Sequence, residues 1–138
     1  MLRNLGILGH WGLILSVMAT PAAAADKKEL VQHGRYLVHQ VAMCVQCHTP
    51  RTEQGQLDRT RLLQGAPMPV ESPFSRETWA FKAPSLAGLP GGWTAEDMIR
   101  LLQTGKGPGG ERPRPPMPPF RMTREDAAAV ATYLQSLR

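Results

Sequence analysis

The sequence has 138 residues, of which 42% are hydrophobic and 6% aromatic, and this length predicts one small domain. The 16 Lys and Arg residues outnumber the 11 Asp and Glu residues, which gives a net charge of +5 at neutral pH. The basic residues are spread along the chain, without the stripe and the stacking aromatic residues of a nucleic-acid-binding protein, so no nucleic-acid partner is expected. At most, the charge favours a partner with an acidic docking face.

Residues 1–25 have the organisation of a secretory signal peptide. Arg3 precedes an apolar stretch, residues 5–19, and a run of small residues follows it. A transmembrane anchor is the alternative, but a span needs about 20 apolar residues, and three glycines and a histidine interrupt this shorter stretch. We therefore expect residues 1–25 to be removed, leaving a mature domain of residues 26–138 in a bacterial periplasm, without a membrane span.

The mature domain is predicted to begin with a helix. Asp26-x-x-Glu29 is a helix-start signal, and one apolar face of helical period follows it, made of Leu30, Gly34, Leu37, Val38 and Val41. A glycine inside a helix costs about 1 kcal/mol relative to alanine, so we expect a close-packing reason for Gly34. We interpret His33 and His39 on this helix as solvated polar residues rather than ligands.

The most informative stretch is Cys44-Val45-Gln46-Cys47-His48. Cys-x-x-Cys-His is the attachment signature of c-type haem, in which both thiols form thioethers and the histidine binds the iron. A zinc site needs about four ligands, and the chain has no further cysteine. A thioredoxin-like pair lies between a strand and a helix, whereas a helix is predicted before Cys44. A disulfide fits the spacing but gives His48 no role. The pattern predicts one covalent haem c and one iron.

Residues 49–83 are irregular, because glycines and prolines interrupt any period. A loop of this length is uncommon in a compact domain. We expect it to wrap one edge of a large ligand, with Trp79 and Phe81 as apolar contacts and a short helical turn or a wrapping contact at Leu62-Leu63.

Two more helices are predicted in the second half of the chain. Thr94 begins the first of them and Gly105 ends it, with an inner face of Met98, Leu101 and Leu102. Thr123-x-x-Asp126 begins the last helix, whose apolar face is made of Ala127, Val130, Ala131, Leu134 and Leu137. Between the two helices, residues 105–119 contain four glycines and six prolines. Met117 lies among these prolines, in a loop rigid enough to hold a thioether at a fixed distance from an iron.

In this order of elements the chain resembles a class I cytochrome c over essentially all of residues 26–138. It is similar in particular to the monohaem domains of cytochrome subunits of periplasmic dehydrogenases. The resemblance implies an all-α, cytochrome c-like fold, with about three main helices and loops wrapped around one covalent haem. It also implies that Gly34 lets the first helix cross closely over Val130 and Tyr133 of the last.

The resemblance assigns a role to each candidate site residue. Cys44 and Cys47 bind the haem, and the iron has His48 as its proximal and Met117 as its distal ligand. Pro84 offers its carbonyl to the other nitrogen of His48, Leu86 packs on the haem, and Trp93 reaches a propionate. Met117 has four rivals in the mature domain, of which only one, Met68, is also framed by prolines: Met43, Met68, Met98 and Met122.

The function implied is electron transfer rather than catalysis, by a soluble shuttle or by a subunit of a larger complex. The expected partners are redox proteins, namely a periplasmic dehydrogenase, a terminal oxidase or another cytochrome. Two alternatives stay open: a peroxidase-like haem enzyme with an open iron position, and a redox or gas sensor in which Met117 leaves the iron. Arg112, Arg114 and Arg121 lie near Met117 in the sequence and are interpreted as solvated rather than as distal catalytic groups.

Overall fold

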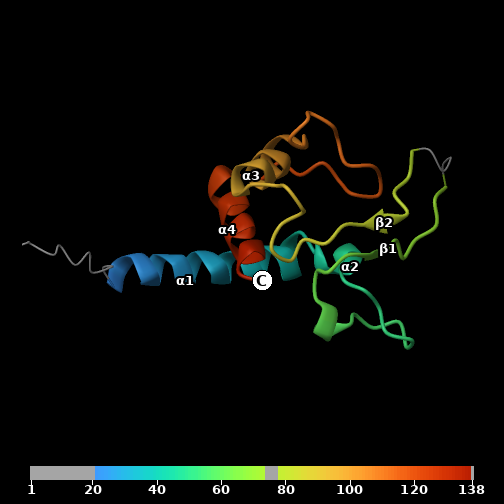
Figure 1. Ribbon diagram of the computed structural model, residues 1–138, viewed down its shortest axis with the longest axis horizontal. Helices are drawn as coiled ribbons and strands as arrows, with labels where there is room; N and C mark the ends of the chain where they lie inside the picture. The colour runs from blue at the N-terminus through green and yellow to red at the C-terminus, as the bar shows by residue number, and fades with distance from the viewer. Residues whose placement is uncertain (1–20, 74–77, 138) are drawn as a thin grey trace, which may run out of the picture.

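The structure, a computed structural model, describes residues 21–73 and 78–137. Its α-helices are α1 (Pro21–Tyr36), α2 (Val45–His48), α3 (Ala95–Thr104) and α4 (Arg124–Gln135). Shorter elements are a π-helical turn η1 (Leu37–Val41), a 3₁₀ turn η2 (Arg59–Arg61) and two strands, β1 (Ala66–Pro67) and β2 (Lys82–Ala83). In Figure 1, α4 crosses α1 near the carboxyl end of α1, and α3 packs on α4. No helix among the described residues is long and apolar enough to cross a membrane.

Helix α1 begins at Pro21, so the predicted start at Asp26 is wrong. Proline is favoured in the first turn of a helix, and the alanines after it have the highest helix propensity, so the helix extends beyond the Asp26 signal. The greater part of the predicted signal peptide, residues 1–20, lies outside the described residues. Its removal therefore stays a prediction.

The apolar face predicted for the first helix is buried only in part. Leu37 and Val38 are buried, whereas Leu30 is 37% exposed and Val41 is 55% exposed. Val41 ends the π-helical turn η1. A π-helical turn inserts an extra residue into the helical repeat and rotates the residues after it away from the previous face. The interior side of α1 is instead continued by Val31, which packs against the core.

The close contact predicted at Gly34 is confirmed. A Cβ atom added to Gly34 would lie 2.0 Å from the carbonyl oxygen of Ala129 and 2.8 Å from Cβ of Tyr133. Tyr133 was expected there, whereas Val130 was expected in the place that Ala129 occupies. Residues four positions apart share one face of a helix, so Ala129 and Tyr133 meet α1 together. Val130 belongs to the neighbouring face and is buried on the other side of the crossing.

The two histidines predicted to be solvated, His33 on α1 and His39 on η1, both contact α4. His33 Nε2 lies 2.8 Å from Oδ1 of Asp126, and His39 Nε2 lies 2.7 Å from the hydroxyl oxygen of Tyr133. The hydrogen bond from His33 lowers the pKa of Asp126. Burial lowers the pKa of His39, and the positive charge of Arg35 adds to this effect. Both histidines therefore have a structural role at the helix crossing.

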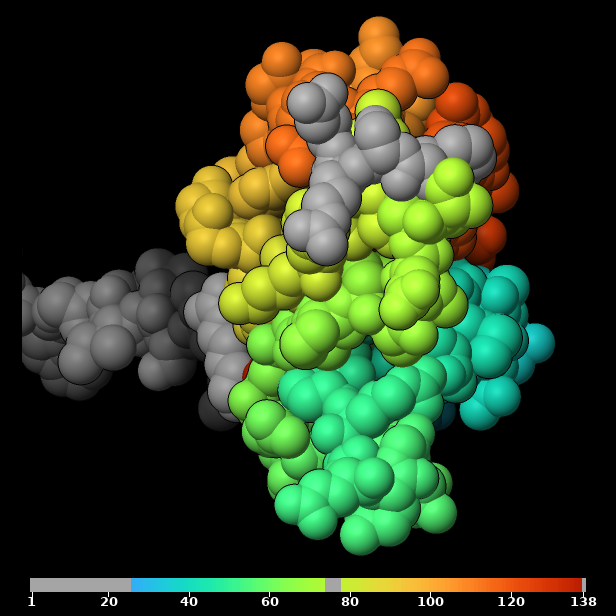
Figure 2. All heavy atoms as spheres, turned by 90° about the vertical axis from the view of Figure 1, so that its right-hand side faces the viewer, coloured from blue at the N-terminus to red at the C-terminus, as the bar shows by residue number. Residues whose placement is uncertain are grey.

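The irregular segment between α2 and α3 contains more structure than the sequence indicated. Strands β1 and β2 pair in antiparallel orientation, with Ala66 opposite Ala83 and Pro67 opposite Lys82. The segment then meets the loop before α4, because the Ala80 N–H donates to the carbonyl oxygen of Pro115 over 2.8 Å. In Figure 2, the loop before α4 (orange) lies at the top of this face, above the segment around β2 (yellow-green). The segment therefore connects the region after α2 with the loop before α4.

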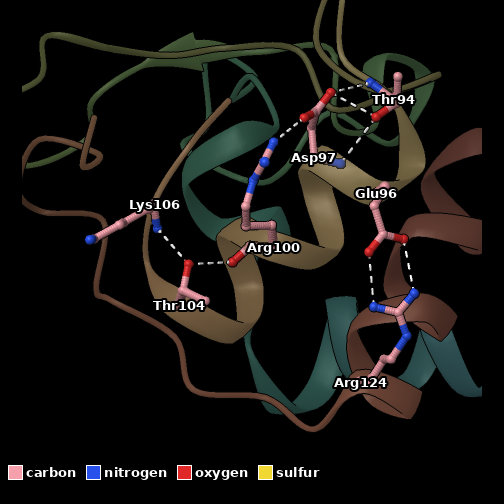
Figure 3. Close-up of polar contacts among 7 residues, drawn as sticks. All are labelled: Thr94, Glu96, Asp97, Arg100, Thr104, Lys106 and Arg124. Atoms are coloured by element: carbon pink, nitrogen blue, oxygen red, sulfur yellow. Dashed lines mark hydrogen bonds and ion pairs between the residues drawn. The ribbon is translucent and has the colours of Figure 1, made fainter. Parts of the chain in front are cut away.

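Helices α3 and α4 begin as predicted and α3 also ends as predicted, whereas α4 ends at Gln135, before Leu137 of its predicted apolar face. Thr94 and Asp97 form a reciprocal cap at the start of α3, in which each side chain accepts a hydrogen bond from the other residue's backbone N–H (Figure 3). Gly105 ends α3 in the left-handed conformation, with φ +72°. Thr123 caps α4. Figure 3 also shows the two-pronged ion pair of Arg124 with Glu96, at 2.9 and 3.0 Å, which joins the first turns of the two helices.

Candidate functional site

A cavity of about 630 Å³ lies between α2, β2, α3, α4 and the loop before α4. Its volume falls within the range of about 300–1,000 Å³ that is typical of sites for cofactors and small molecules. All seven residues singled out in the sequence line it: Cys44, Cys47, His48, Pro84, Leu86, Trp93 and Met117. They come from positions 44 to 117 of the chain, so it is the tertiary fold that brings them together.

The two cysteines lie at the start of α2. Cys44 caps this single helical turn and Cys47 lies within it, and both side chains are free thiols that are partly buried. Burial raises the pKa of the Cys44 thiol to about 11, and the neighbouring Cys47 adds to the rise. No group of three or more His, Cys, Asp or Glu side chains in the described part of the chain is arranged to hold a metal ion, so a zinc site finds no ligand set there. Both cysteines instead line the cavity.

His48 is held in one orientation and one tautomer. The residue is 6% exposed, and its Nδ1 lies 2.8 Å from the carbonyl oxygen of Pro84. Because a carbonyl oxygen only accepts, Nδ1 carries the proton and Nε2 keeps its lone pair. Burial lowers the pKa of His48, although the hydrogen bond to Pro84 opposes this shift. The ring is thus a neutral imidazole with one nitrogen prepared to bind a metal.

Four methionines line the cavity: Met43, Met68, Met98 and Met117. Met98 is 3% exposed on the inner face of α3, where packing explains it, and Met43 is 47% exposed beside Cys44. Met117 and Met68 are both half-buried on irregular segments. Met122 is not part of the cavity wall and donates its backbone N–H to the carbonyl oxygen of Leu102. Met68 therefore remains the serious rival of Met117 as a sulfur ligand.

The other predicted contacts divide between the cavity and its surroundings. Leu86 is 7% exposed, and Trp93 is half-buried. Phe81 lines the cavity although it is 57% exposed, whereas Trp79 is half-buried and is not part of the wall. The expected contribution of Trp79 to the ligand contact is therefore wrong. Its backbone neighbour Ala80 does line the cavity, and the Ala80 N–H donates to the carbonyl oxygen of Pro115, which ties this part of the wall to the loop before α4.

The rim of the cavity carries three exposed cations, Lys82, Arg112 and Arg114, and one exposed anion, Glu111. None of the three cations has a side-chain hydrogen bond or ion pair with another described residue. The prediction that Arg112 and Arg114 are solvated agrees with their exposure, but the sequence did not indicate that they border the cavity. Arg121, in contrast, donates to the carbonyl oxygen of Phe120 and is not part of the wall. The rim therefore favours the carboxylates of a bound group or of a partner.

These groups together fit haem c. The walls are mainly apolar, two thiols three positions apart border them, and a neutral imidazole and a thioether reach the same space. Exposed cationic side chains among the lining residues could pair with the propionates of a haem. A signal for most of this set was present in the sequence. Lys82 had none, because only the pairing of β1 with β2 brings it to the cavity, whereas the prolines around Met68 had already marked that residue as a rival of Met117.

Comparison with known proteins also indicates a protein that binds haem c. The family model for cytochrome c matches residues 31–138. A diheme cytochrome c-type protein of Cereibacter sphaeroides is 31% identical over 134 residues, which cover 94% of this chain and 42% of that protein. The cytochrome subunit of fructose dehydrogenase from Gluconobacter japonicus is 28% identical over 113 residues, covering 75% of this chain and 21% of that protein.

The chain thus spans less than half the length of these curated relatives. The family match covers most of the chain, and the described residues form helices with one short strand pair. The predicted all-α, cytochrome c-like fold is therefore confirmed. Membership of this family implies a covalent haem c and its iron. The chain belongs to the cytochrome c family.

Proposed function

We propose that this protein is a periplasmic carrier of single electrons, with one covalent haem c whose iron is bound by His48 and Met117. The observation that carries the proposal is the convergence of Cys44, Cys47, His48 and Met117 on one apolar cavity. Bound there, haem c supplies an iron that accepts and releases one electron. The two cysteines of this sequence suffice for one attachment motif, which supports a single haem.

Each residue has a separate task in this proposal. Cys44 and Cys47 anchor the group by thioether bonds, so that it stays with the protein in both oxidation states. His48 binds the iron through Nε2, while the hydrogen bond from Nδ1 to Pro84 holds the ring and raises its basicity. Met117 would supply the second protein ligand of the iron, so that no position on the iron stays open for a substrate. Leu86 and the other apolar walls exclude water, which favours the less charged, reduced state.

The partners proposed are redox proteins of the periplasm. One relative is the cytochrome subunit of a dehydrogenase, which supports a dehydrogenase as the electron donor. A terminal oxidase or another cytochrome would then accept the electron. The signal-like residues 1–25 support export, and the net positive charge supports docking to an acidic face.

Carbon monoxide separates this proposal from its alternatives. Protein matured in its native host is reduced, exposed to carbon monoxide and followed by its absorption spectrum. With both axial positions filled by side chains we expect little change, because the gas must displace a protein ligand. A peroxidase-like enzyme or a sensor with a weakly held ligand would bind the gas readily, and rapid, complete binding would contradict an electron carrier.

A further inference from the structure

Gly65 lies between His48 and Pro84, whose hydrogen bond orients the His48 ring. On one side, its backbone N–H donates to the carbonyl oxygen of His48 over 2.8 Å. On the other side, it packs against the backbone of residues 83–85. A Cβ atom on Gly65 would lie 2.8 Å from the nitrogen of Ser85 and 3.0 Å from the carbonyl carbon of Pro84. Distances this short to backbone atoms mean that the backbone must move if any side chain is added.

The surrounding hydrogen bonds make this part of the chain a spacer between the two sides. Two residues before Gly65, the Leu63 N–H donates to the hydroxyl of Thr49 over 3.0 Å. The Leu63 carbonyl accepts from the backbone N–H of Leu86 over 2.8 Å. Directly after Gly65, strand β1 pairs with β2. Residues 63–67 are thus bonded to the end of α2 on one side and to residues 82–86 on the other. The space that residues 63–67 occupy therefore sets the distance between the end of α2 and residues 82–86.

We propose that Gly65 is a positioning residue that sets the hydrogen bond between His48 Nδ1 and the Pro84 carbonyl, and through it the reduction potential. The inference rests on the proposed role of His48 as an iron ligand. A methyl group at position 65 pushes the Pro84 carbonyl away from the imidazole. The weaker hydrogen bond makes the imidazole a poorer electron donor, which disfavours the oxidised iron. The reduction potential therefore rises.

The chain offers a matched control for this substitution. Gly55 has φ +81° and Gly65 has φ +82°, so alanine strains the backbone equally at both positions. Nothing lies within 4 Å of a Cβ atom at Gly55, whereas the backbone of residues 83–85 blocks it at Gly65. Comparing Gly65→Ala with Gly55→Ala therefore separates the contact with Pro84 from the cost of a left-handed alanine.

Two quantities are measured on the haem-loaded proteins: the reduction potential, and the rate at which the His48 ring N–H exchanges with solvent, read by NMR. Gly65→Ala should show a higher potential and faster exchange than the unaltered protein, while Gly55→Ala keeps both values. If a haem-loaded Gly65→Ala keeps the original potential and exchange rate, or if both variants shift alike, the positioning role is wrong.

A second variant covers the case in which Gly65→Ala fails to mature. Thr49→Val removes the acceptor of the Leu63 N–H without adding bulk beside Pro84. The spacer is then held less firmly, and we again expect a raised potential and faster exchange. An unchanged potential in haem-loaded Thr49→Val would overturn the inference while leaving the electron-carrier function intact. If the unaltered protein itself lacks covalent haem, the proposed function fails first, and this inference fails with it.

Discussion

Replacing Met117 with alanine should lower the reduction potential by tenths of a volt, given that axial ligands set haem potentials over a range of about 0.8 V. A thioether favours the reduced iron, so its loss favours the oxidised state. The same substitution should abolish the weak red absorption of an iron–thioether bond. It should also let the reduced protein bind carbon monoxide, since one axial position loses its protein ligand. Redox titration and absorption spectra with and without the gas test all three effects.

Met68→Ala is the matched control, because Met68 lies in the same cavity on an equally half-buried segment. If Met117 is the ligand, Met68→Ala keeps the red absorption and binds the gas poorly. Met122→Ala provides a second control outside the cavity wall. Should Met68→Ala produce all three effects and Met117→Ala none, the ligand assignment moves to Met68.

The second large effect is expected at the crossing of α1 and α4. A Cβ atom at Gly34 would lie 2.0 Å from a backbone oxygen of Ala129, so Gly34→Val forces the two helices apart. Overpacking of this kind costs about 1–3 kcal/mol, and the rigid backbone places the change at the upper end of that range. The proposed iron ligands, His48 and Met117, lie on other segments, so the spectrum should stay the same. Urea unfolding of the haem-loaded protein measures the loss.

Gly91→Val is the control for this substitution. A Cβ atom at Gly91 meets nothing within 4 Å, and the backbone there needs no left-handed conformation. Its free energy of unfolding should change by less than about 0.5 kcal/mol. Equal stability of the two variants would show that the helices have room at Gly34, in contradiction to the crossing described above.

The parts of the fold that could be predicted from sequence are those set by neighbouring residues. Thr94 and Thr123 cap their helices through residues three positions later, and Gly105 ends α3 by its own conformation, so each signal lies within one turn. The attachment motif is likewise local. Gly34 is informative because a glycine inside a helix is unfavourable unless something requires it, here the backbone of α4.

Features that depend on distant contacts could not be predicted. Strands β1 and β2 have two residues each, too few for a period, and their pairing brings Lys82 to the cavity. The π-helical turn η1 turns Val41 outward without any glycine or proline to indicate it. The role of Gly65 depends on residues 83–85, which reach it only in the folded chain. The hydrogen bonds of His33 and His39 are to side chains of α4 that lie 93 and 94 positions further along the chain.

The central claim is that this cavity holds one haem, bound through Cys44 and Cys47. The most direct test is the intact mass of the protein, matured in its native host and measured under denaturing conditions. The account predicts a single species with the mass of the chain after removal of residues 1–25, plus one haem that survives denaturation. A polypeptide mass without haem, from protein that was coloured before denaturation, would contradict covalent attachment and with it the proposed site.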